Sequence, residues 1–227
     1  MGGQACIFYG AAEFSRDLDL LVLADAANWP NLVQALATLS ADVIAVPSLE
    51  QRHLLRGHAV HLRCHREDVA GLRIDLMSRL RGVAGFEELW TRRTSIEVNN
   101  EVVDLLAIED LVRAKKTQRD KDWPMIRRLV EQSYFGRSAT PSPAQVRFWL
   151  RELRSPELLV EVAYEHSGLA AAEAALRPAL QAALSGEPTA VGEALEAEER
   201  EERRKDREYW DPLKRELEEL RMGRRKL

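Results

Sequence analysis

Hydrophobic and polar positions in the first half of the chain alternate in short stretches that predict strands separated by helices. Residues 17–23 (DLDLLVL) form an apolar, leucine-rich run that is typical of a buried strand. Residues 31–39 (NLVQALATL) carry Leu32, Ala35 and Leu39 at helical spacing, on one face of an expected helix. A strand and a helix therefore follow one another at the start of the chain.

Two hairpins are predicted next. Within residues 59–79, two runs of alternating apolar and polar residues flank a polar turn at 66–71. A shorter hairpin is expected over residues 94–107, with Asn99 and Asn100 as its turn residues. These strands and the first one would form a small mixed sheet flanked by helices, which is an α+β domain.

From Ile108 onward the pattern is helical. Apolar residues recur at helical spacing over 108–135, with a break expected near 122–124, where a proline stands. The tail, 193–227, is dense in Glu, Arg and Lys and carries one narrow apolar stripe. The stripe consists of Trp210, Leu213, Leu217 and Leu220. It suits a solvated helix lying on the body, or a helix that binds a partner or a second copy.

Further signals mark helix ends between these segments. Ser-Pro pairs begin at Ser142 and Ser155, and each predicts an N-cap followed by proline in the first turn. Gly168 is expected to end the second of these helices, and an alanine-rich helix is expected over 169–184. A Gly/Pro break at 186–188 precedes the tail. These signals divide the chain into regions 1–132, 133–190 and 191–227.

Composition narrows the class of protein. The 227 residues carry a net charge of −4, so the chain has no global basic field for nucleic acid, although a local basic groove is compatible with it. No apolar stretch reaches the roughly 20 residues of a membrane helix, and no signal peptide pattern opens the chain. Cys6 and Cys64 are expected to be free thiols in a reducing cytoplasm.

Three aspartates are candidate metal ligands. Asp17 and Asp19 point to the same face of a strand, where two carboxylates repel each other unless a cation lies between them. Asp75 faces away from the apolar layer of its own strand and would join them if the strands are neighbours. Oxygen ligands of this kind suit Mg²⁺ and phosphoryl or nucleotidyl transfer. Alternatively, these aspartates are strand-edge, turn and surface residues.

A glycine pair, Gly2 and Gly3, precedes the aspartates and favours the metal hypothesis. Glycines allow the backbone to approach a phosphate, and the following helix would direct its first amides toward it. Residues 2–22 (GGQACIFYGAAEFSRDLDLLV) resemble the signature of the polymerase-β-type nucleotidyltransferase superfamily: a glycine pair, a short helix and Asp-x-Asp on the next strand. Within it, the chain is similar to the bacterial AbiEii/MNT-like group, which includes toxins of toxin–antitoxin and phage-defence pairs.

A second match lies in residues 104–126. In the same group a lysine is followed by Arg-x-Lys-Asp, and the matching positions here are Lys115 or Lys116, Arg119, Lys121 and Asp122. The resemblance implies that Lys115, Arg119 and Lys121 contact the triphosphate of a nucleotide. For each of them, a solvated helix face is the alternative.

The resemblance covers residues 2 to about 130 and implies a nucleotidyltransferase fold followed by a helical C-terminal region. Asp17, Asp19 and Asp75 would hold two Mg²⁺ ions, with Asp75 also acting as base, and Gly2, Gly3 and Arg16 would contact phosphates. The implied reaction moves a nucleoside monophosphate from an NTP to an acceptor such as tRNA, another RNA, a protein or a small molecule. An antitoxin partner and a cytoplasmic location are part of the same expectation.

Two features depart from this expectation. The superfamily has a strand before the glycine pair, and nothing precedes Met1 in the chain as written. Either the start is assigned too far downstream, or this version lacks the strand, and an inactive binding or scaffolding module is the alternative function. The second feature is a histidine-rich stretch that suggests zinc, namely His53, His58, His61 and His65 beside Cys64. Its spacing matches no common zinc motif, and Cys64 is expected on the opposite strand face. The polar side of this hairpin, with Arg63 and Arg73, could instead contact an anionic acceptor such as RNA.

Overall fold

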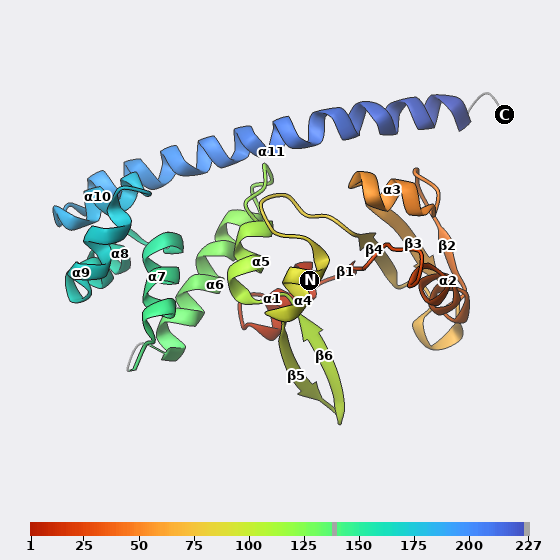
Figure 1. Cartoon of the computed structure of the whole chain (residues 1–227), viewed down its shortest axis with the longest axis horizontal. Helices are drawn as coiled ribbons and strands as arrows, with labels where there is room; N and C mark the ends of the chain where they lie inside the picture. The colour runs from red at the N-terminus through yellow and green to blue at the C-terminus, as the bar shows by residue number, and fades with distance from the viewer. Residues whose placement is uncertain (138–139, 225–227) are drawn as a thin grey trace. The chain divides into compact units, whose positions relative to one another are not determined.

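The computed structural model describes residues 1–137 and 140–224, and Figure 1 labels its helices and strands. Contacts among these residues divide the chain into two compact units. Unit 1 comprises Met1–Phe8, Ala12–Ala114 and the residues from Glu208 onward, and unit 2 comprises Tyr9–Ala11 and Lys115–Arg207. The division therefore falls at other positions than the boundaries expected at 132 and 190.

A four-stranded mixed sheet forms the centre of unit 1. Its order is β1 (Asp17–Leu21), β4 (Arg73–Met77), β3 (Val60–Cys64) and β2 (Ala41–Val43). β1 pairs with β4 in parallel, and the other pairs are antiparallel. The predicted hairpin over 59–79 is thus β3 and β4, and the α+β class is confirmed. β1 lies at the edge of the sheet, where β4 is its neighbour.

One face of this sheet is the apolar core of unit 1. Leu62, Ile74 and Leu76 are almost fully buried there and pack with Leu36 of α2 (Trp29–Thr38) and Leu54 of α3 (Gln51–Arg56). The strand residues between them point to the other face because side chains alternate along a strand. This second face carries the polar residues of β1, β3 and β4. The alternation along the strands thus places apolar and polar side chains on opposite faces of the sheet.

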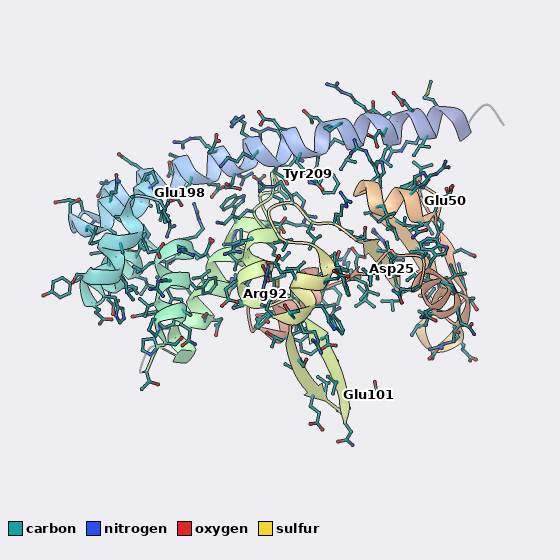
Figure 2. All side chains as sticks on the ribbon, in the orientation of Figure 1. Asp25, Glu50, Arg92, Glu101, Glu198 and Tyr209 are labelled. Atoms are coloured by element: carbon teal, nitrogen blue, oxygen red, sulfur yellow. The ribbon has the colours of Figure 1, made fainter. Side chains whose placement is uncertain are left out.

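The second predicted hairpin is confirmed as β5 (Thr94–Val98) and β6 (Glu101–Leu105). It forms a separate two-stranded sheet, however, and does not join the four-stranded sheet as expected. Its turn residues Asn99 and Asn100 have φ values of 52° and 65°, a left-handed conformation that asparagine tolerates. Glu101 stands at the tip of the hairpin in Figure 2. α4 (Phe86–Thr91) precedes the hairpin, and α5 (Ile108–Ala114) follows it.

A bidentate ion pair links the segments on either side of this hairpin. Arg92, labelled in Figure 2, donates from Nε and Nη2 to the two carboxylate oxygens of Asp110, at 2.5 and 3.0 Å. Asp110 is 1% exposed, so a planar guanidinium satisfies a buried carboxylate here.

Unit 2 is helical. Its helices are α6 (Asp122–Arg137), α7 (Pro143–Glu152), α8 (Pro156–Glu165), α9 (Ser167–Ala174), α10 (Pro178–Leu184) and the first part of α11 (Pro188–Arg224). Buried Ile126, Leu129, Trp149 and Leu150 belong to its core. Ser142 caps α7 with a capping box, as its Ser-Pro pair predicts.

Two expectations about helix ends in unit 2 are wrong, and a third is displaced. The helical pattern over 108–135 is broken as expected, but at 115–121 and not at 122–124. α6 begins at Asp122, because Pro124 lies in its first turn, where a missing N–H costs nothing. Gly168 does not end α8, which stops at Glu165, and lies inside α9. The single helix expected over 169–184 is two helices, since Pro178 starts α10.

The predicted charged tail, 193–227, is helical over 193–224 as part of α11, and its residues 225–227 lie outside the described residues. The part of this helix from Glu208 onward belongs to unit 1. Leu213 of the apolar stripe is 3% exposed, and it lies near Gly57 together with Tyr209. The other stripe residues, Trp210, Leu217 and Leu220, are half-buried. This packing favours a helix lying on the body over one left open for a partner. Among the residues that the structure describes, none of the helices is both long and apolar enough to span a membrane.

Candidate functional site

The three predicted aspartates lie on one face of neighbouring strands. In the register of β1 and β4, Asp19 is directly opposite Asp75, and Asp17 is opposite Arg73. His61 of β3 pairs with Asp75 from the other side. Asp17 and Asp19 share a face because they are two residues apart, and this face is opposite the apolar core. Residues far apart in the sequence thus form one polar row across three strands.

Asp75 is partly satisfied by basic neighbours. Its Oδ1 accepts a hydrogen bond of 2.8 Å from His61 Nδ1 and one of 3.4 Å from Arg73 Nη2. Burial acts to raise the pKa of Asp75, but the hydrogen bond and charge of His61, together with Arg73, bring it below the ordinary value. Asp75 is therefore ionised at neutral pH, and its Oδ2 has no hydrogen-bond partner among the described residues.

Arg73 places a positive charge between two of the carboxylates. Its Nε lies 3.6 Å from Asp17 Oδ1, and its Nη2 lies 3.4 Å from Asp75 Oδ1. The same Nε is buried and has no hydrogen-bond partner in the described chain, so the guanidinium is held by charge without ideal geometry. The positive charge beside these two carboxylates is thus the Arg73 guanidinium.

The glycine pair packs directly against this row. Gly2 has a φ of +66°, and a Cβ on it would overlap the Asp19 carboxylate. Gly3 donates its backbone N–H to Asp19 Oδ2 at 3.2 Å, and a Cβ on it would overlap the Ser15 side chain. Both positions therefore require glycine for steric reasons. α1 (Gly2–Phe8) continues from them, as the short helix of the resemblance implies.

The donor set suits Mg²⁺ by type, since it offers three carboxylates and no sulfur. Within the described ranges, however, no group of three or more His, Cys, Asp or Glu side chains is placed to hold a metal ion. Arg73 pairs with Asp17 and with one oxygen of Asp75.

The predicted phosphate contacts are spread over both units. Arg16 of unit 1 is exposed and pairs with no acidic residue in the described part of the chain. In unit 2, Lys115 Nζ lies 3.4 Å from Asp122 Oδ1, and Arg119 Nε lies 2.7 Å from Asp122 Oδ2. Lys121 is exposed. Two of the three basic residues in the second motif are thus paired with the aspartate that ends the motif.

Asp122 is the centre of a compact buried network. Thr117 Oγ1 also donates to its Oδ2, at 2.6 Å. Burial acts to raise the pKa of Asp122, but the charge of Lys115, the Thr117 hydrogen bond and Arg119 lower it overall. The network ties the loop before α6 to the first residue of that helix.

The four histidines suspected of binding zinc divide between two places. His61 bonds to Asp75, and His65 Nε2 lies 3.4 Å from Asp42 Oδ2. His53 and His58 contact each other near α3, with ring centroids 6.2 Å apart. Cys64 lies in the core, where burial raises the pKa of its thiol. This arrangement offers no common zinc ligand set within the described residues.

Two features of the site were not predicted as contacts. They are the Arg73–Asp17 ion pair and the His61–Asp75 hydrogen bond. The second had a signal in the sequence, because the turn length of the β3–β4 hairpin fixes which residues face each other. The first had none, because it depends on pairing between strands that are far apart in the chain.

Comparison with protein-family models, with curated proteins and with solved structures finds no match to this chain.

Proposed function

We propose that unit 1 is a polymerase-β-type nucleotidyltransferase domain that transfers a nucleoside monophosphate from an NTP to an acceptor hydroxyl or amine. One observation carries the proposal: Asp17, Asp19 and Asp75 share a sheet face, and a sterically required glycine pair packs on Asp19. Asp19 and Asp75 are like charges directly opposite each other, an arrangement that is unfavourable without a cation.

The chemistry divides among this chain's own residues. Asp17, Asp19 and Asp75 would hold two Mg²⁺ ions, which when bound would neutralise charge on the triphosphate oxygens. Gly2 and Gly3 would let the phosphates approach the backbone at Asp19. The acceptor oxygen or nitrogen bonds to the α-phosphorus, the bond to the bridging oxygen breaks, and pyrophosphate leaves.

The lowered pKa of Asp75 bears on its role. A carboxylate that stays ionised is a good ligand for a cation but a weak base, because it binds a proton poorly. We therefore assign Asp75 chiefly to holding the cation through its unpartnered Oδ2. Drawing the proton from the acceptor is the lesser part of its role.

The Arg73 contacts favour a second candidate, an inactive nucleotidyltransferase-like module that binds or scaffolds. A guanidinium that bridges Asp17 and Asp75 permanently would stabilise the row without metal. In that case the carboxylates serve structure, and no NTP is turned over.

Transfer assays with matched variants separate these candidates. The full chain is incubated with each α-labelled NTP, Mg²⁺ and total tRNA, and Mg²⁺-dependent NTP binding is measured in parallel. The proposal expects Asp19→Asn to reduce transfer by about 10³-fold or more, since it removes charge where Mg²⁺ is required. Asp42→Asn is the control, because Asp42 lies on β2 of the same sheet and is exposed. If the full chain showed no transfer and no Mg²⁺-dependent NTP binding, the enzyme proposal would be overturned and the inactive module favoured.

A further inference from the structure

A cavity of about 830 Å³ lies in unit 1, and none of the aspartates of the candidate site lines it. Its apolar wall comes from Val43, Val46 and Pro47, between β2 and α3, and from Leu220 of α11. Its volume is in the range of pockets that bind small molecules, roughly 300–1,000 Å³. Tyr209, labelled in Figure 2, marks the start of the α11 segment that approaches α3 in this unit.

Most of the charges around the cavity are already paired. Arg52 Nη2 lies 2.9 Å from Glu50 Oε2, and Arg56 donates three hydrogen bonds of 2.5–3.1 Å to Glu216. Glu216 also bonds to His58 Nε2 at 2.8 Å. The hydrogen bonds from Arg56 lower the pKa of Glu216, which is therefore ionised and compensated. These groups leave little positive charge for an anionic ligand.

His53 leaves a hydrogen-bond acceptor at the cavity. The residue is 8% exposed, and its Nδ1 lies 3.0 Å from the Ser48 carbonyl oxygen. Because a carbonyl oxygen only accepts, Nδ1 carries the proton, and Nε2 of the neutral ring carries a lone pair. Nε2 has no hydrogen-bond partner among the described residues. A donor on a ligand in the cavity could hydrogen-bond to this lone pair.

Glu219 is the second uncompensated group. It lines the cavity from α11, is exposed, and has no ion-pair partner within the described ranges. His58 Nδ1, also on a residue that lines the cavity, is buried without a hydrogen-bond partner among the described residues. His53 Nε2 and Glu219 are an acceptor and an anion, and both favour a ligand that donates.

We propose that this cavity binds a protonated amine that carries an apolar, ring-sized body. The body would lie against the apolar wall of Val43, Val46, Pro47 and Leu220, and the ammonium would donate to His53 Nε2 or to Glu219. The site is separate from the proposed transferase site, and its test does not depend on that activity.

Three matched probes test the charge of the ligand. Binding of tryptamine, 3-ethylindole and indole-3-propanoate to the full chain is measured by calorimetry and by NMR shift perturbation. We expect tryptamine to bind about ten-fold or more tightly than indole-3-propanoate, with 3-ethylindole between them. Equal affinities, the reverse order, or no binding by any of the three would overturn the proposal.

Two variants locate the ammonium. Glu219→Gln is expected to weaken tryptamine binding about three- to five-fold, the size of one exposed charge interaction. Glu218→Gln is the control, because Glu218 is its exposed neighbour on α11 and does not line this cavity. His53→Asn keeps a donor where Nδ1 lies and removes Nε2, and about five-fold weaker binding is expected. An equal loss in the Glu218 variant would indicate non-specific attraction and contradict the proposal.

Discussion

Asp75 of unit 1 and Asp122 of unit 2 are both aspartates with basic neighbours, but their surroundings differ. Asp122 is 1% exposed, and both of its oxygens are used: Oδ1 faces Lys115, and Oδ2 accepts from Thr117 and Arg119. A carboxylate with both oxygens engaged by its own chain has little accepting capacity left for a ligand. Its role is to hold the loop before α6.

Asp75 is the more open of the two. Its side chain is 16% exposed, and both partners, His61 and Arg73, use Oδ1. It also faces Asp19 across the strand pair, and it shares Arg73 with Asp17. A basic neighbour therefore does not by itself decide the role of a carboxylate. A candidate binding site differs from a purely structural ion pair in having a carboxylate oxygen that no other group of the protein contacts.

The largest expected effect concerns stability. Asp122→Ala should lower the free energy of unfolding by about 3 kcal/mol, because it leaves the Lys115 ammonium buried and unpaired. Asp75→Ala should cost about 1 kcal/mol or less, since its partners remain in contact with water. Urea unfolding followed by tryptophan fluorescence measures both. Similar losses of unfolding free energy in the two variants would contradict the different roles assigned to Asp122 and Asp75.

A smaller effect should appear with Mg²⁺. Arg73→Gln removes the cation between Asp17 and Asp75, and should cost about 1 kcal/mol in EDTA. Mg²⁺ at about 10 mM should restore the loss, because binding to the folded state alone stabilises it. Arg119→Gln removes a cation from Asp122 and should show no recovery with Mg²⁺. The measurement is the thermal unfolding temperature of each variant with and without Mg²⁺. An equal change in both variants would contradict a cation site at Asp75.

The smallest effect is in acid. Both aspartates have a pKa below the ordinary 3.8, so the stability they contribute is present above that value and is lost as the pH falls through their folded pKa. Asp122→Asn and Asp75→Asn should each flatten the acid limb of stability, by at most about 1.4 kcal/mol per pH unit for one proton. The measurement is urea unfolding between pH 2 and pH 6, approximately the range over which one carboxyl titrates. If both variants lost stability in acid as steeply as the parent protein, other carboxylates would be responsible for the acid dependence.

Local patterns in the sequence were sufficient for several elements. Alternation of apolar and polar residues predicted the β3–β4 hairpin, and Asn99 with Asn100 predicted the turn of the β5–β6 hairpin. These features depend on neighbours in the chain, which the sequence displays directly. Helix ends were less predictable, as Gly168 and Pro178 show, because a glycine or proline can lie inside, before or after a helix.

Which residues share a strand face follows from the sequence alone, so Asp17 was predicted to lie with Asp19, and Asp75 outside the apolar layer. The tertiary structure alone decided that β1 lies parallel to β4, which brings Asp19 opposite Asp75 and Arg73 beside Asp17. It also decided that Lys115 and Arg119 pair with Asp122. The physical reason is the same in each case. A face follows from the two-residue period of one strand, whereas a partner depends on how distant segments pack to bury their apolar sides.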